Sequence, residues 1–144
     1  MATQYTGGLT AGQILTAATM NSIGAAWETW TPTYTSTVLG PPTSVTTNLA
    51  RYAQIGKCVF FQLGVTVNVV GTASGRLIFT LPLTAQATTA TNLSIGNGWE
   101  WAATTVQLQC YKTTATTAAI IFSNGNNTVV AGYTITLTGM YEAA

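Results

Sequence analysis

The chain has 144 residues, only 5% of which are charged, and its net charge at pH 7 is +1; an average globular domain has roughly 25% charged residues. Its four basic residues are scattered and cannot form the cluster that displaces counterions from nucleic acid, so we expect no nucleic-acid binding. Hydrophobic residues make up 47% of the chain, but no apolar run approaches the ~20 residues that span a bilayer, so we expect no membrane insertion.

The small number of charges also bears on assembly. A net charge near zero and exposed apolar area both favour association, so we expect much of the surface to be buried against other copies of the chain. The first residues, MATQYTGGLT, lack a basic segment followed by an apolar one. This predicts no secretory signal, and synthesis in the cytoplasm.

Residues 1–26 are expected to form an arm and a short helix. Residues 1–15 contain three glycines and little periodicity, which is typical of an extended arm that orders only against a partner. Thr16 is a candidate N-cap, good helix formers follow it, and Gly24 is a candidate stop, so a helix of roughly two turns is predicted. Isolated helices this short are marginal in water, and we therefore expect this one to pack on a partner.

From Trp27 onward the pattern is that of β-strands. Apolar and polar residues alternate over residues 58–70 and again over 132–141, which predicts two strands with one buried face each. In the first, Val59, Phe61, Leu63, Val65, Val67 and Val69 share the buried face, and Gln62, Thr66 and Asn68 share the other. In the second, Tyr133, Ile135, Leu137 and Tyr141 face one way, and Thr134, Thr136 and Thr138 face the other.

Six further strands are predicted, with turn signals between them. About eight short strands without a second helix favour an antiparallel β-sandwich or jelly roll over residues 27–144. The turn at 124–127 is also a candidate receptor contact. The six strand candidates are 27–35, 44–54, 75–81, 92–101, 104–112 and 117–123, and the turn signals lie at 40–42, 71–75, 82, 96–98 and 124–127.

The residues that most enzyme chemistry needs are missing. There is no histidine and no aspartate, which excludes a Ser-His-Asp or Cys-His arrangement within one chain and removes the commonest metal ligand. The three glutamates, Glu28, Glu100 and Glu142, could support glycoside hydrolysis only if two of them came within several Å of each other. No phosphate-binding glycine motif is present. We therefore expect a protein without catalytic activity, cofactor or metal.

The two cysteines, Cys58 and Cys110, each lie in a predicted strand. A lone cysteine in a strand behaves as a small hydrophobe. We favour two buried free thiols, with one disulfide as the alternative, because cytoplasmic products rarely carry structural disulfides.

The segment GNGWEWAATT, residues 96–105, is the candidate binding site. Trp99 and Trp101 are two residues apart, so they share one face of a strand while Glu100 points the opposite way. Two indole faces beside the Glu100 carboxylate and the Asn97 amide could stack on sugar rings and hydrogen-bond to their hydroxyls. The alternative, which is the commoner one for large aromatic residues, is that both indoles fill the core or a subunit interface.

Four short motifs in the first part of the chain carry a resemblance. GQILTAATMN at residues 12–21 has the form G-x-x-L-T-A-x-x-M-N, and WTPT follows at residues 30–33. YAQIGKCV at residues 52–59 has the form Y-x-x-I-G-K-x-V, and FTLP at residues 79–82 is followed by TA. This pattern resembles virion proteins of tailed bacteriophages, a group of tail fibres, minor tail proteins and head fibres or spikes. The matches span residues 12–85, and beyond them the likeness is one of composition.

The resemblance implies a virion protein in which residues 1–26 attach to capsid, portal-proximal or tail proteins and residues 27–144 project as a homotrimer. The projecting domain would adhere to the host surface, through glycan in our interpretation. One alternative is a capsid decoration protein that stabilises the head, and another is a free carbohydrate-binding module. The attachment residues in the matched segment would be Leu15, Thr16, Met20, Asn21 and Ile23.

Overall fold

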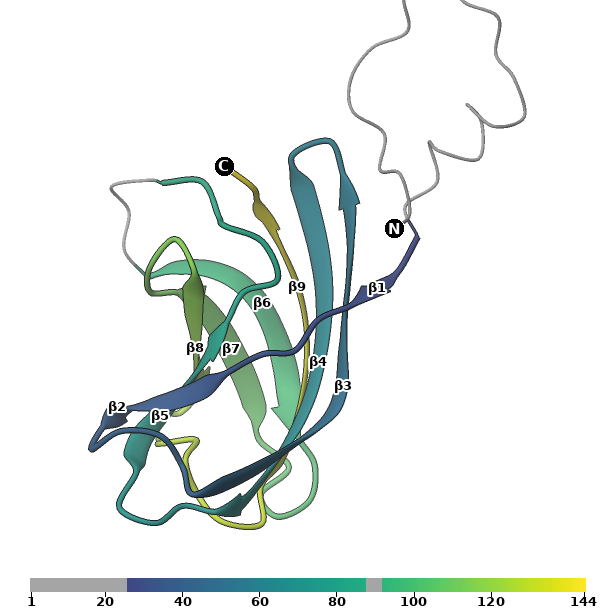
Figure 1. Cartoon of the computed structure of the whole chain (residues 1–144). Coiled ribbons are helices and arrows are strands. Elements are labelled where there is room, and N and C mark those ends of the chain that lie inside the picture. Colours follow the sequence, from purple (N-terminus) through teal and green to yellow (C-terminus); the bar gives the residue numbers. More distant parts are fainter. Residues whose placement is uncertain (1–25, 88–91) are drawn as a thin grey trace, which may run out of the picture.

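The computed structural model describes residues 26–87 and 92–144, which form antiparallel strands and no helix (Figure 1). The prediction of an all-β, antiparallel fold is confirmed. The predicted arm and helix, with Leu15, Thr16, Met20, Asn21 and Ile23, lie outside the described residues. The strands are β1 (Glu28–Thr29), β2 (Tyr34–Val38), β3 (Ser44–Ile55), β4 (Cys58–Val69), β5 (Ser74–Thr80), β6 (Leu93–Glu100), β7 (Gln107–Lys112), β8 (Thr117–Phe122) and β9 (Thr134–Glu142). In the described part of the chain, no helix has the length and hydropathy to cross a membrane.

All of these strands belong to one curled sheet, whereas the prediction had two sheets packed face to face. The strand order is β1-β3-β4-β9-β6-β7-β8-β5-β2. Alternation along the sequence cannot separate the two architectures, because a curled sheet and a sandwich both bury every second residue. The concave side of the curled sheet therefore holds the core that two facing sheets would hold in a sandwich.

The segment that contains β1 and β2 holds the two ends of the sheet together. β1 pairs with β3 at one end and β2 pairs with β5 at the other, so the chain crosses the open side of the roll (Figure 1). Between the two strands, the Trp30 indole Nε1 donates a hydrogen bond to the Thr80 carbonyl at 3.2 Å. The predicted strand 27–35 is thus broken in two around Pro32, which has no N–H for a sheet ladder.

The two clearest predicted strands supply the centre of the core. Val59, Phe61, Leu63, Val65 and Val67 of β4 are at most 1% exposed, as the alternation predicts. Val69, at the end of the strand, is 49% exposed and departs from it. On β9 the inward set is Ile135, Leu137 and Tyr141. Each such side chain contributes roughly 1.5–3 kcal/mol when fully buried, so these strands account for much of the hydrophobic stabilisation.

Glycines allow β6 and β9 to approach each other closely. A Cβ on Gly98 would collide with the Thr136 carbonyl oxygen, and one on Gly96 would lie 2.6 Å from the Thr138 carbonyl oxygen. The register also shifts between Ser94 and Gly96, which marks a bulge. Residues 96–98 were predicted both as a turn signal and as part of the strand 92–101; the strand is confirmed and the turn is wrong. They lie inside β6, because glycine in a strand marks a bend or a close backbone approach as well as a turn.

Both cysteines are free thiols, in agreement with the favoured prediction. Cys110 is fully buried, and the loss of hydration on burial raises the pKa of its thiol. Cys58 is only partly buried, and its Sγ lies 4.0 Å from Met140 Sδ. The prediction of two buried thiols therefore holds fully for Cys110 alone.

Candidate functional site

The convex side of β3, β4, β9 and β6 forms a continuous surface, which we call the outer face. Strand register aligns its side chains in rows. One row runs through Leu49, Gly64, Thr136 and Trp99. The next row runs through Arg51, Gln62, Thr138 and Asn97. Residues from four strands, far apart in the sequence, are therefore neighbours on this face.

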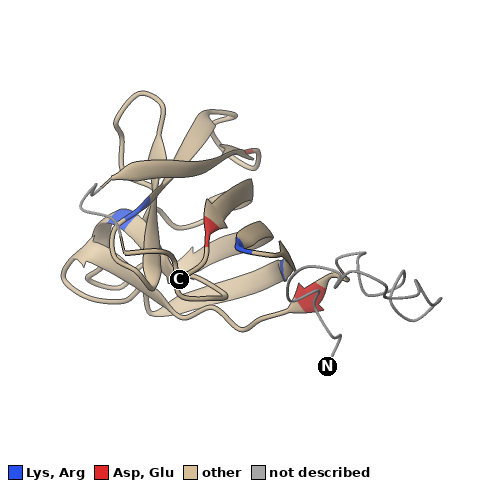
Figure 2. Cartoon of the chain, turned by 90° about the horizontal axis from the view of Figure 1, so that it is seen from above, with Lys and Arg blue, Asp and Glu red and all other residues tan. Residues whose placement is uncertain are grey.

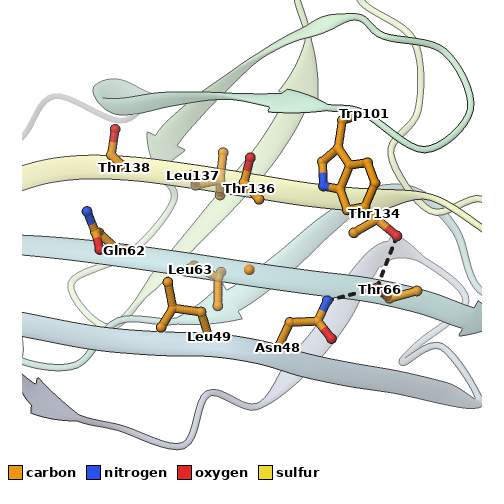
Figure 3. A pocket seen from close by; sticks show the side chains of 11 residues that line it. Asn48, Leu49, Gln62, Leu63, Thr66, Trp101, Thr134, Thr136, Leu137 and Thr138 are labelled. Atoms are coloured by element: carbon orange, nitrogen blue, oxygen red, sulfur yellow. Dashed lines mark hydrogen bonds between the residues drawn. The ribbon is translucent and has the colours of Figure 1, made fainter.

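A groove on the outer face has a volume of about 570 Å³, within the roughly 300–1,000 Å³ of small-molecule sites. Gly64, which has no side chain, lies in its lining between Leu49 and Thr136. Leu49 and Trp101 stand on opposite sides of the groove (Figure 3). We call this site the indole groove; its lining is Asn48, Leu49, Gln62, Leu63, Gly64, Thr66, Trp101, Thr134, Thr136, Leu137 and Thr138.

Hydrogen bonds fix the polar side chains at the two ends of the groove. Asn48 Nδ2 donates to Thr66 Oγ1 at 2.9 Å, and Thr66 Oγ1 lies 3.1 Å from Thr134 Oγ1 (Figure 3). Arg51 Nε donates to Gln62 Oε1 at 2.6 Å. The Asn48 oxygen and the Gln62 nitrogen take no part in these two bonds, and an amide accepts through its oxygen and donates through its nitrogen. The two ends of the groove thus carry an acceptor and a donor on side chains that hydrogen bonds hold.

Three of the four predicted sugar-binding residues share the outer face. Asn97 is exposed, and Trp99 and Trp101 are 46% and 58% exposed. The alternative that both indoles fill the core of the chain is therefore wrong. Their alternative role in a subunit interface stays a prediction, because an exposed indole fits an interface as well as it fits a ligand.

Glu100 points away from the two indoles, as the strand period predicts, and its carboxylate is fully buried. It accepts hydrogen bonds from the backbone N–H groups of Ala102, Ala103, Thr104 and Thr134, and from the Thr104 hydroxyl. Burial alone would raise the pKa of Glu100, but these hydrogen bonds outweigh it and lower the pKa to about 2. The carboxylate is thus occupied within the protein, and we assign Glu100 to the support of the loop rather than to ligand contact.

The loop that Glu100 supports begins with Trp101. The Glu100 N–H donates to the Val106 carbonyl at 3.0 Å, which closes the loop. The Trp101 N–H donates to the Thr134 carbonyl at 3.2 Å, which anchors the loop to β9. Thr105 in this loop has a φ of 53°, a strained conformation for a β-branched residue. Strain of this kind persists only where surrounding contacts impose it, and here the Glu100 hydrogen bonds supply those contacts. Trp101 is therefore held in place beside the groove.

Sequence reasoning missed the side chains that β3, β4 and β9 contribute to the groove. The signal was present in part, because Gln62, Thr66, Thr134, Thr136 and Thr138 were predicted to lie on the polar faces of their strands. What was missing was the pairing that places those faces beside Trp101.

A second part of the outer face is apolar. Phe60 stands directly opposite Met140, and Ile55 opposite Cys58. Ile55, Phe60 and Met140 are 48%, 38% and 57% exposed. We call Ile55, Cys58, Phe60 and Met140 the apolar end patch, because they lie beside the β3–β4 hairpin at one end of the sheet.

Charged residues are few and lie at scattered points along the described part of the ribbon (Figure 2). Arg51, beside the outer face, lies 4.8 Å from the centre of the Trp27 ring, in addition to its bond to Gln62. Within residues 26–87 and 92–144, no three His, Cys, Asp or Glu side chains form a group that could hold a metal ion.

Asparagine and glycine at 124–127 predict a hairpin turn, and that is wrong, because β8 pairs with β5 and β7 and not with β9. The chain does turn here, at the end of β8. The Gly125 N–H donates to the Phe122 carbonyl at 2.9 Å, and the Asn126 N–H donates to Asn124 Oδ1 at 3.0 Å. These four residues are exposed.

Comparison of the chain with protein-family models, with curated proteins and with solved structures gave no match.

Proposed function

We propose that the chain is a non-enzymatic surface protein of a tailed-phage virion. Residues 1–26 attach it to the particle, and residues 27–144 project and adhere to a glycan on the host surface. The virion part of this proposal rests on the motifs in residues 12–85. The adhesion part rests on the outer face, where exposed indoles border a groove lined with hydroxyls and amides.

The observation that carries the proposal is the placement of the groove relative to the point where the chain enters the domain. β1 runs away from the β3–β4 hairpin, because Glu28 pairs with Tyr52 and Thr29 with Arg51. The chain thus enters from the hairpin end. The loop after β6, which begins with Trp101, lies at the opposite end of the roll (Figure 1).

The length of β9 gives the scale of this separation. Trp101 is bonded to Thr134 at one end of β9, and Glu142 pairs with Cys58 of the hairpin at the other. The two ends of β9 are about 26 Å apart at the usual rise of roughly 3.3 Å per residue. An anchor on the hairpin side would therefore leave Trp101 at the end of the roll away from the particle, with the indole groove opening to the side of the domain.

A homotrimer is part of the proposal. The apolar end patch exposes three large apolar side chains, and the charged residues beside it, Lys57 and Glu142, have opposite signs. Burial of this patch between copies would remove apolar area from water while leaving the indole groove open. Light scattering should then give about 45 kDa, three times the 15.0 kDa of one chain.

Two pairs of substitutions in the full-length chain separate attachment from adhesion. We expect fluorescently labelled protein to bind host cells and also to rejoin particles that lack it. Trp99→Ala with Trp101→Ala should abolish cell binding and leave particle binding unchanged, because it removes both indoles from the outer face. Leu15→Asp with Met20→Asp should abolish particle binding and leave cell binding unchanged. Trp27→Ala, which removes an indole that is also 47% exposed but lies outside the groove lining, is the matched control.

A capsid decoration protein is the second candidate, and the apolar end patch beside the entry of the chain favours it, since that patch could lie against a capsid. In that case the wild-type chain would not bind cells. It would bind over the surface of capsids and raise their thermal stability. Substitution of Phe60 and Met140 in the patch, rather than of Trp99 and Trp101, would then weaken capsid binding. That set of results would refute the adhesin.

A further inference from the structure

We infer that the indole groove takes an uncharged oligosaccharide of at least two sugar units. This inference rests on the proposed function and names the ligand class of the same site. It depends on three features of the groove: the absence of charge from its lining, the pairing of donors with acceptors, and the spacing of the two indoles.

The lining excludes a charged ligand. None of its residues is ionisable, and the nearby Glu100 carboxylate is buried and faces the loop. Arg51 is the ionisable residue beside the lining, at the Gln62 end of the groove, where it bonds to Gln62 and lies against the Trp27 ring. A sialic acid, uronate or phosphate at the Trp101 end of the groove would lose hydration without gaining an ion partner, which is costly. A neutral sugar incurs no such cost.

The polar groups of the groove match hydroxyls. The Asn48 oxygen can accept, the Gln62 nitrogen can donate, and the Thr138 hydroxyl can do both. The Thr136 hydroxyl donates to the Trp99 carbonyl at 3.5 Å and can accept from a ligand. A sugar hydroxyl also donates and accepts, so it can satisfy each of these groups in turn. A purely apolar ligand would leave the same groups without partners, and an unsatisfied buried polar group costs roughly 1–3 kcal/mol.

The indoles set the minimum length of the ligand. Trp99 stands opposite Thr136, and the Trp101 N–H bonds to Thr134, two residues earlier on β9. Residues two apart on a strand are about 6.6 Å apart, so each indole can stack on a different ring of one chain. Because the Glu100 hydrogen bonds hold the start of the loop, little conformational entropy is lost when Trp101 engages a sugar.

The test uses the full-length chain and immobilised oligosaccharides in matched neutral and acidic forms. One set contains hexoses and N-acetylhexosamines, and the other contains the same chains capped with sialic acid or built from uronates. We expect the chain to bind one or more neutral oligosaccharides, equally well at low and high salt, and to bind their acidic forms more weakly. Single sugars should bind at least tenfold more weakly than oligosaccharides.

Variants locate the site. Trp101→Ala should weaken binding at least tenfold. Thr136→Val, which removes a hydroxyl but keeps the shape of the side chain, should weaken it about fivefold. Thr35→Val, the same change on β2 outside the groove, is the matched control and should leave binding unchanged. Thermal unfolding of each variant checks that the fold is intact.

Three results would overturn the inference. The first is preferential binding of acidic sugars that weakens as salt is added. The second is wild-type affinity for the neutral sugar in both Trp101→Ala and Thr136→Val. The third is attachment to host cells without binding to any neutral oligosaccharide, in which case the adhesin proposal stands and only the ligand class fails. Binding to neither cells nor sugars would remove the proposed function as well.

Discussion

Glu100→Gln should lower the free energy of unfolding at pH 7 by about 3 kcal/mol and the melting temperature by roughly 6–12 °C. Both carboxylate oxygens of Glu100 accept hydrogen bonds from N–H or O–H donors. A glutamine of the same shape would direct its NH₂ group at one set of those donors and leave them unsatisfied. Chemical denaturation followed by circular dichroism measures the difference. Glu142→Gln, at an exposed glutamate on β9, is the control and should change stability by less than about 0.5 kcal/mol.

The same carboxylate predicts a dependence of stability on pH. The folded pKa of Glu100 is about 2, below the ordinary value of 4.5, so the folded state favours the ionised form. This contribution is fully present above the unfolded pKa and is lost as the pH falls towards 2. Between pH 6 and pH 2, the wild-type chain should therefore lose more stability than Glu100→Gln does. Parallel curves for the two proteins would contradict the role assigned to Glu100.

Gly98→Ala should destabilise the fold by about 3 kcal/mol or more, or prevent folding. The added Cβ would overlap the Thr136 carbonyl oxygen and lie 2.6 Å from Leu137 Cδ2. A backbone oxygen in a strand ladder cannot move aside as a flexible side chain can, so β6 and β9 would have to separate.

Gly64→Ala on the neighbouring β4 is the matched control. Its added Cβ would lie 3.3 Å from Leu49 Cβ and 3.4 Å from the Leu49 backbone nitrogen, tight contacts that a small movement of β3 relieves, whereas the Gly98 Cβ would overlap a carbonyl oxygen. Alanine also reduces the conformational entropy of the unfolded chain relative to glycine. We therefore expect a change within about 1 kcal/mol at this position. Equal unfolding midpoints for the two variants would show that the β6–β9 contact is not as tight as described.

The strands could be predicted from the sequence, and the sheet order could not. Alternation within β4 and β9 is a local signal, and it correctly assigned Phe61 and Ile135 to the core and Thr66 and Thr136 to the outside. The pairing of β4 with β9 joins Cys58 to Glu142 across most of the domain, and no local pattern specifies such a partner. The crossing of β1 and β2 over the open side of the roll is likewise a long-range result.

The candidate site could likewise be predicted only where the signal is local. The period of a strand placed Trp99 and Trp101 together and Glu100 opposite, and the structure agrees. The sequence did not indicate that Glu100 would be enclosed by the loop that follows it, because that depends on the turn at Ala102–Thr104. It left Gly96 and Gly98 open between two structures, because the predicted strand 92–101 contains them and the same residues also form turns.

The measurement that tests the account most directly is oxidative footprinting of the full-length chain, free and bound to host cells. If the outer face is the contact surface, Trp99, Trp101 and Leu49 should be protected from oxidation in the bound state. Leu39, which is 72% exposed in the β2–β3 loop, should be oxidised equally in both states. Protection of Leu39, with Trp99 and Trp101 oxidised as in the free protein, would place the contact elsewhere and contradict the account.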